Sequence, residues 1–143
     1  MTSNRYKRRI IRSKLLALAH QRPDEFWVDS FSKRKAYLRI GNLRVVLRKT
    51  DPLLDIIRRI RAQHAEAAIK RAALIYKSNE GNGKTQQKAL RVIREVIRKY
   101  RCFVFTQEDV ARLRRLNPRL IPLDREIASR VFGDNRHYYL YIL

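Results

Sequence analysis

The sequence predicts a mainly α-helical protein organised around a central helix–turn–helix hairpin at residues 51–101. A long segment without helix breakers, a glycine-containing turn and a second segment with clear helical periodicity predict this hairpin. A basic N-terminal helical arm, a small β-hairpin at about residues 35–48 and short C-terminal helices complete the predicted fold. At 143 residues we expect one domain, in which residues 1–50 are arm and ribbon and residues 102–143 a packing or assembly segment.

The arm is predicted as an amphipathic helix from Asn4 to about Gln21, ended by Pro23. Arginines cluster on one side near its start, and no acidic residue balances them. We therefore expect the arm to lie against phosphates. The alternative is an ordinary surface helix with a solvated basic face.

Residues 35–48 are predicted to form a β-hairpin about Gly41-Asn42, because glycine at the first turn position favours tight turns. Pairing across the turn separates an apolar face from a basic one. The apolar face holds Ala36, Leu38, Ile40, Leu43, Val45 and Leu47, and the basic face holds Lys35, Tyr37, Arg39, Arg44, Val46 and Arg48. Such a ribbon can enter a groove of nucleic acid, although charges on an exposed strand also protect against edge pairing. Residues 26–28 are a further short strand candidate.

The first helix of the hairpin is predicted from the cap Asp51 and Pro52 to about Lys77, and residues 78–83 supply the turn. The second helix, residues 84–101, carries a basic stripe beside an apolar one. The basic stripe is Lys84, Lys88, Arg91, Arg94, Arg98 and Arg101, and the apolar stripe is Ala89, Leu90, Ile93, Val96, Ile97 and Tyr100. One side of this helix is therefore expected to face a core and the other a polyanion. The alanine-rich middle of the first helix lets another helix, or a nucleic-acid backbone, approach closely.

Beyond the hairpin, residues 103–105 are predicted as a strand or as the buried end of the second helix. Residues 106–116 and 124–132 are predicted as capped helices. The terminus, residues 136–143, is apolar and aromatic, so it is predicted to be a last strand or an intermolecular contact.

The net charge of +21 indicates the partner. A small soluble domain needs a charge of magnitude only roughly 2–8, and a larger excess is self-repulsive unless a polyanion neutralises it. Residues 1–50 hold 14 basic and 3 acidic residues, whereas residues 101–143 hold 8 and 5. Nucleic acid is the expected partner, ahead of an anionic membrane surface, and DNA and RNA are both open. The predicted nucleic-acid-binding residues are Arg5, Arg8, Arg9, Arg12, Lys35, Arg39, Arg44, Arg48, Arg58, Arg61, Lys84, Lys88, Arg91, Arg94, Arg98 and Arg101.

No catalytic residues, metal site or cofactor are predicted, and we expect that the protein is not an enzyme. Residues 78–85 match only the end of a P-loop and follow a helix rather than a strand. The single Cys102 excludes a disulfide framework. Neither a secretory signal nor a membrane span is predicted, so an intracellular location is expected.

In overall character, the hairpin Asp51–Arg101 with its arginine-rich arm resembles the small coat (nucleocapsid) proteins of filamentous viruses of hyperthermophilic archaea. The resemblance implies a mainly helical subunit that pairs with itself or with a related coat subunit. It also implies that the pair clasps double-stranded DNA in an A-like form, and that pairs stack into a helical filament in the virion. The function implied is a structural protein that wraps and condenses DNA without sequence specificity, through phosphate contacts.

Two other functions are open. The C-terminal segments have the order strand, helix, helix and wing, which is typical of a winged-helix regulator, with Arg125 and Arg130 facing a groove. The composition also fits a ribosomal or other RNA-binding protein, although exposed stacking aromatics are not evident in the sequence.

Overall fold

Two three-stranded antiparallel sheets and five α-helices make up the described part of the chain. This computed structural model describes the backbone of residues 2–113 and 120–142, and the side chains of residues 12–113 and 120–142. The predicted mainly helical fold class is wrong, and the protein is mixed α/β, because short segments distant in sequence pair into sheets. Residues 1–63 form one compact unit, unit 1, and residues 64–143 form another, unit 2.

Unit 1 is a helical arm, a three-stranded meander and the start of a long helix. Its elements are α1 (Thr2–Gln21), the short 3-10 helix η1 (Pro23–Glu25), β1 (Phe26–Phe31), β2 (Lys35–Ile40), β3 (Leu43–Arg48) and the beginning of α2 (Pro52–Ser78). The predicted hairpin is confirmed, since Ile40 pairs with Leu43 across a two-residue turn in which Gly41 has a φ of 55°. Strand β1 pairs antiparallel with β2, with a register shift after Val28.

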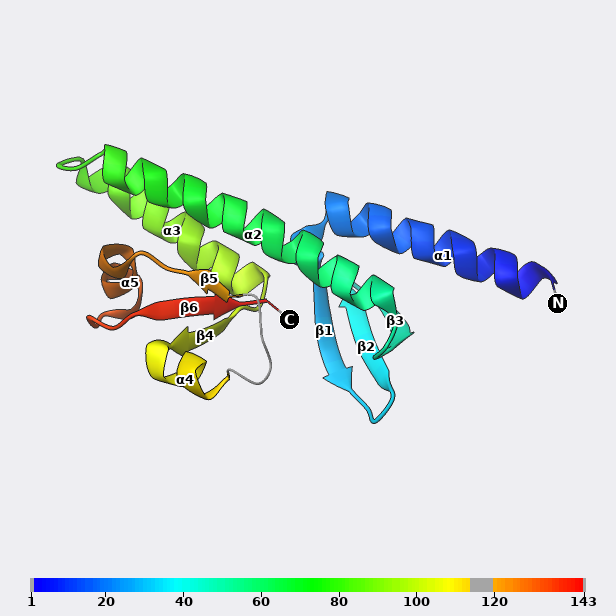
Figure 1. Ribbon diagram of the computed structural model, residues 1–143. Helices are drawn as coiled ribbons and strands as arrows, with labels where there is room; N and C mark the ends of the chain where they lie inside the picture. Colours follow the sequence, from blue (N-terminus) through cyan, green and yellow to red (C-terminus); the bar gives the residue numbers. More distant parts are fainter. Residues whose placement is uncertain (1, 114–119, 143) are drawn as a thin grey trace. The chain divides into compact units, whose positions relative to one another are not determined.

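The inner face of this sheet packs against α1 and α2 (Figure 1). Its buried side chains are Phe26, Ala36, Leu38, Ile40 and Leu47. Leu15 and Ala19 of α1 and Leu53 and Ile57 of α2 complete this core. The predicted division of the hairpin into two faces is therefore confirmed. Leu43, at the turn, is 59% exposed although it shares the apolar face.

Unit 2 combines the helix hairpin with a second sheet. The rest of α2 is followed by α3 (Gly83–Lys99), β4 (Phe103–Thr106), α4 (Gln107–Arg112), β5 (Leu120–Pro122), α5 (Arg125–Phe132) and β6 (Tyr138–Tyr141). The sheet order is β4-β6-β5, so the predicted last strand is the central strand of the sheet. The predicted end of the first of the two short helices, near residue 116, lies outside the described residues.

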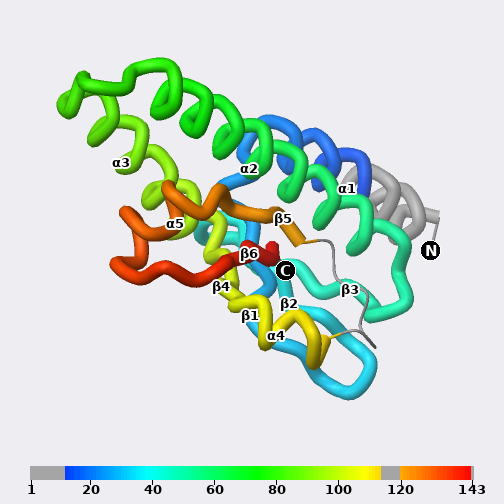
Figure 2. Tube along the Cα trace, turned by 60° about the vertical axis from the view of Figure 1, so that its left-hand side comes forward, coloured from blue at the N-terminus to red at the C-terminus, as the bar shows by residue number. Residues whose placement is uncertain are grey.

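The predicted helix hairpin is present, and α2 and α3 lie side by side in two views (Figures 1 and 2). Asn82 caps α3 by accepting a hydrogen bond from the N–H of Thr85. The helix ends at Lys99, and Arg101, with a φ of 51°, lies beyond it. The apolar stripe is confirmed by the burial of Ala89, Leu90, Ile93, Val96 and Tyr100. Among the residues that the structure describes, none of the helices is long and apolar enough to cross a membrane.

Candidate nucleic-acid interface

A basic hollow lies along β3, an edge strand of the unit 1 sheet. Its volume is about 760 Å³, and it is lined by Arg12, Leu15, Lys35, Arg44, Val45, Val46, Leu47, Arg48 and Asp51. The hollow thus brings one predicted residue of the arm together with three of the ribbon. Asp51 is the single carboxylate among the lining residues.

The outer face of the same sheet places like charges opposite each other. The register pairs Lys35 with Arg48 and Arg39 with Arg44. Directly opposed like charges destabilise an antiparallel sheet. Arg39 is partly offset, since its Nε lies 3.5 Å from Oδ2 of Asp29. At the Lys35–Arg48 end, within the described chain, no carboxylate lies within ion-pair distance of either side chain.

Three basic residues that the sequence analysis did not select extend this end of the sheet: Lys33, Arg34 and Lys49. All three are exposed, and the N–H of Lys49 donates to the carbonyl oxygen of Arg34 at 3.0 Å. The hairpin pairing that joins residue 35 to residue 48 also joins residue 34 to residue 49. Continuing the pairing one residue beyond the predicted hairpin could therefore have found Arg34 and Lys49, although not Lys33.

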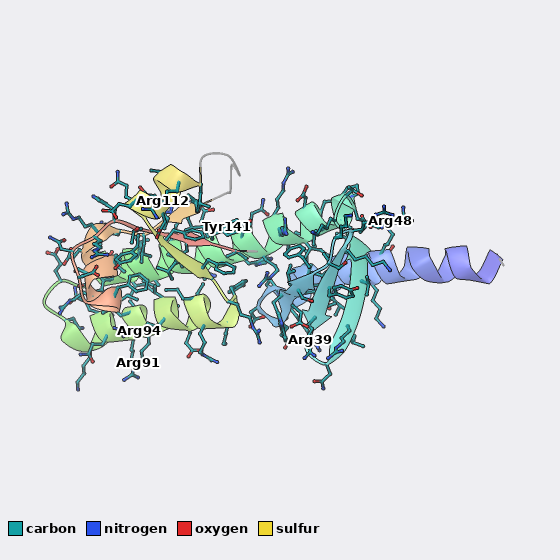
Figure 3. All side chains as sticks on the ribbon, turned by 90° about the horizontal axis from the view of Figure 1, so that it is seen from below. Arg39, Arg48, Arg91, Arg94, Arg112 and Tyr141 are labelled. Carbon is teal, nitrogen blue, oxygen red and sulfur yellow. The ribbon has the colours of Figure 1, made fainter. Side chains whose placement is uncertain are left out.

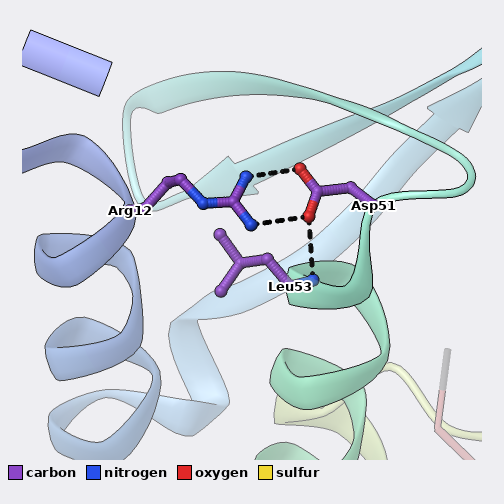
Figure 4. A network of polar contacts seen from close by, with 3 residues as sticks. All are labelled: Arg12, Asp51 and Leu53. Atoms are coloured by element: carbon purple, nitrogen blue, oxygen red, sulfur yellow. Dashed lines mark hydrogen bonds and ion pairs between the residues drawn. The ribbon is translucent and has the colours of Figure 1, made fainter. Parts of the chain in front are cut away.

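Arg12 is held in place by a two-pronged ion pair with Asp51 (Figure 4). Its Nη1 and Nη2 donate to the two carboxylate oxygens at 2.6 and 2.9 Å. Asp51 Oδ1 also accepts from the N–H of Leu53 at 2.9 Å, which confirms the predicted cap of α2. The hydrogen bonds from Arg12 hold the pKa of Asp51 below its ordinary value. Because its charge is matched by Asp51, Arg12 closes one wall of the hollow rather than adding net charge to it.

The predicted basic stripe is exposed along α3. Lys84, Lys88, Arg91, Arg94 and Arg98 are all exposed on this helix. Figure 3 shows Arg91 and Arg94 projecting from α3. Arg98 forms an ion pair with Glu95 at 2.8 Å within the helix. The stripe is therefore a solvent-facing surface whose effective charge is lower near its C-terminal end.

A second basic hollow lies between α3 and α5 in unit 2. Its volume is about 420 Å³, and it is lined by Gly83, Gln86, Gln87, Leu90, Arg91, Arg94 and Arg130. Arg94 donates to the carbonyl oxygen of Arg130 at 3.1 Å, and Nε of Arg130 donates to the hydroxyl of Tyr76 at 3.2 Å. Three guanidinium groups and two amides line it, which is a donor set suited to a phosphate. Arg130 was predicted only as a groove residue of the winged-helix alternative, because nothing local indicates that α5 packs against α3.

Asp124 fixes the start of α5 and so the position of Arg130. Its carboxylate accepts from the N–H groups of Glu126 and Ile127 and pairs with Nζ of Lys77 at 2.6 Å. Burial raises the pKa of Asp124, but the hydrogen bonds from Lys77 and from the two backbone amides outweigh it, so that the pKa lies below its ordinary value. The predicted cap at this position is confirmed.

Two predicted residues of α2 do not fit an open interface. Arg61 is 1% exposed, and its Nε donates to the carbonyl oxygen of Pro23 at 3.1 Å, so it cannot reach a phosphate in this conformation. Arg58 is partly buried, lies 5.7 Å from the ring centroid of Phe31, and is 3.9 Å from Asp55. Helical spacing alone could not show that these arginines turn inward, because an arginine stem is itself apolar. The side chains of Arg5, Arg8 and Arg9 lie outside the described residues.

No protein-family model, curated protein or solved structure matches the chain. Within the residues that the structure describes, no group of three or more His, Cys, Asp or Glu side chains could hold a metal ion. The residues of the two hollows and of the α3 stripe are therefore the basis for a functional assignment.

Proposed function

We propose that the protein binds double-stranded DNA without sequence preference, as a structural protein that covers the duplex through phosphate contacts. The observation that carries the proposal is the outer face of the unit 1 sheet. There Lys35 opposes Arg48, and Arg39 opposes Arg44. Holding like charges together costs free energy in the isolated protein. A bound polyanion adds attractive interactions with both side chains that can outweigh this repulsion.

Phosphates are the expected contacts because the surface is broad and basic rather than concentrated on one recognition element. Residues 1–63 hold 17 basic and 5 acidic residues, and residues 64–143 hold 17 and 8. Arginine and lysine position a protein on the duplex through phosphates, whereas sequence is read at base edges. Binding of this kind is driven by counterion release and weakens steeply as salt increases.

The proposal is tested by measuring the affinity of the full chain for several unrelated duplexes over a range of salt concentrations. We expect similar affinities for all sequences, and a linear fall of log K with log salt whose slope is about −0.9 per phosphate contact. A variant with Lys35, Arg44 and Arg48 all changed to Glu should bind weakly and with a shallower slope. The single variant Lys35→Glu has a matched control in Lys14→Glu, on the exposed side of α1, because each changes the net charge by −2.

Two outcomes would overturn the proposal. One is a preference of roughly 10³-fold or more for a single duplex sequence. The other is unchanged duplex affinity in the triple variant, provided that circular dichroism shows it folded. Electron microscopy of saturated complexes tests the coat role separately, since a nucleocapsid subunit should form filaments of fixed stoichiometry.

The two sheets count against both the coat-protein resemblance and the winged-helix alternative. The coat proteins that the hairpin resembles imply a mainly helical subunit, so the proposal rests on the charged surfaces and not on that resemblance. A winged helix needs two adjacent helices after its first strand, whereas β5 lies between α4 and α5 here. Arg125, one of its two predicted groove residues, donates instead to Asn135.

A further inference from the structure

The outer face of the unit 2 sheet is aromatic. In an antiparallel pair, residues opposite each other project from the same face. Phe103 pairs with Tyr141 and Phe105 with Tyr139, so these four rings share one face of β4 and β6. Leu120 and Pro122 of β5 pair with the same two tyrosines and extend that face.

The opposite face of this sheet already serves the core. Its central residues, Leu140 and Ile121, are 0% and 3% exposed. Phe103 on the aromatic face is 49% exposed, and Phe105, Tyr139 and Tyr141 are only partly buried. Sheets with one solvated face normally carry polar side chains there. Four accessible aromatic rings therefore need a separate explanation.

Three of the four rings, those of Phe103, Phe105 and Tyr141, form a connected patch. The centroids of Phe103 and Phe105 are 6.2 Å apart and their planes differ by 6°. Tyr141 lies 6.3 Å from Phe103 and 6.1 Å from Phe105. Successive aromatic rings on an accessible sheet are surfaces on which unpaired bases stack, because every base has a π face.

The charge around the patch favours a polyanion over a second copy of the chain. Exposed arginines lie close to the strands in the chain, since Arg101 precedes β4 and Arg136 precedes β6. The exposed Arg112, labelled in Figure 3, lies on α4, which packs against both strands. Of the nearby carboxylates, Asp134 accepts from the hydroxyl of Tyr138, Asp109 closes the capping box of α4, and Glu108 is exposed. A second copy would bring a further charge of +21 to this face.

We infer that the face formed by Phe103, Phe105, Tyr139 and Tyr141 stacks the unpaired bases of single-stranded DNA. Bases inside a duplex are already stacked on each other, so this face takes a different ligand from the basic sheet of unit 1. The choice of DNA over RNA rests on the proposed function, whereas the stacking face does not. Apart from the hydroxyls of Tyr139 and Tyr141, the patch is built from rings and aliphatic carbons, so it offers few polar groups that would select a 2′-hydroxyl.

The test measures binding of the full chain to three probes of about 12 nucleotides: oligo-dT, oligo-rU, and an abasic strand with the same phosphates. Oligo-dT should bind more tightly than the abasic strand. Phe103→Leu and Tyr141→Leu keep an apolar side chain but remove the ring, and each should weaken oligo-dT binding roughly 5- to 150-fold. Phe103→Trp should preserve it.

Duplex affinity separates this inference from the proposed function. Phe103→Leu should leave duplex binding unchanged, whereas the triple variant of Lys35, Arg44 and Arg48 should reduce it. Equal binding of the dT and abasic strands overturns the stacking face, as does unchanged dT binding by folded Phe103→Leu and Tyr141→Leu variants. Tighter binding of oligo-rU overturns the choice of DNA. A wild-type dimer that Phe103→Leu converts to a monomer, with dT binding unaffected, assigns the face to self-association instead.

Discussion

At the scale of single residues, Asp51 links the stability of unit 1 to the shape of its basic hollow. Its carboxylate caps α2 at the N–H of Leu53 and holds the guanidinium of Arg12 through both oxygens. The cap and the ion pair are separable, because asparagine caps a helix about as well as aspartate but carries no charge. Unit 1 therefore has one position at which the two contributions can be measured independently.

We predict that Asp51→Asn lowers the free energy of unfolding by less than about 1 kcal/mol at neutral pH, because Arg12 is 47% exposed and its ion pair is screened. Asp51→Ala should cost roughly 1 kcal/mol more, through loss of the cap. The pKa of Asp51 is lowered in the folded protein, so its ionised form stabilises the fold above about pH 4, and this contribution is lost as the pH falls through the folded pKa. Denaturation at pH 7 and pH 3 measures both effects. If Asp51→Asn lowered the free energy of unfolding by the same amount at both pH values, the stabilising role of the ionised Asp51 would be contradicted.

Arg61 gives the second prediction at this scale. Arg61→Leu should destabilise the protein by roughly 1–3 kcal/mol, because its guanidinium is buried and bonded to the carbonyl oxygen of Pro23. Arg59→Gln, at an exposed position two residues earlier, should change stability by less than about 0.5 kcal/mol. Chemical denaturation measures the difference. Among folded molecules, Arg61→Leu should bind duplex with an unchanged salt slope, and a shallower slope would return Arg61 to the interface.

At the scale of elements, local patterns could be predicted from the sequence and non-local pairings could not. The β2–β3 hairpin, the α2–α3 hairpin and the caps at Asp51 and Asp124 are correct, because each depends on residues a few positions apart. The two sheets were missed because their remaining pairings are not evident from local patterns. Strand β6 pairs with β4, more than 30 residues earlier, and β1 adds to the hairpin across an irregular register.

In the candidate site, too, features set by local patterns could be predicted and features set by non-local packing could not. The ribbon face and the α3 stripe could be predicted because alternation and helical spacing determine which side chains share a surface. Arg130 could not, since its place beside Arg91 and Arg94 depends on how α5 packs against α3. The aromatic face was missed for a related reason, because Phe103 and Tyr141 become neighbours only when β4 and β6 pair.

The hairpin yields a prediction in which stability and binding change in opposite directions. Lys35→Glu places opposite charges across from each other, so it should raise the free energy of unfolding by roughly 0.2–1 kcal/mol at low salt. The same change should weaken duplex binding. Lys14→Glu makes the same change in net charge but has no cross-strand partner, so it isolates the pairing effect. Denaturation of both variants measures the change in stability, and duplex titration measures the change in affinity. A loss of stability in Lys35→Glu would contradict the predicted repulsion.

At the scale of the whole molecule, the dominant physical property is the net charge of +21, to which both units contribute. Self-repulsion among these charges destabilises the folded state of the free protein. A polyanion that binds the folded chain stabilises it by mass action, by an amount that depends on the ligand concentration relative to Kd. The thermal stability of the chain should therefore depend on its partner as well as on its core.

We predict that duplex DNA raises Tm at low salt, with a free energy of about 2.7 kcal/mol when its concentration is 100 times Kd. The shift should shrink as salt increases, because affinity falls with log salt. Calorimetry with and without duplex at several salt concentrations measures this shift in Tm. The triple variant of Lys35, Arg44 and Arg48 is the control, since its shift should be smaller at every salt concentration.

Added salt alone should raise Tm of the free protein, because screening weakens the repulsion between its own charges. The two effects of salt have opposite signs, so the Tm curves of free and bound protein should converge as salt increases. Parallel curves would contradict binding through phosphate contacts and would leave the basic surfaces as solvated faces.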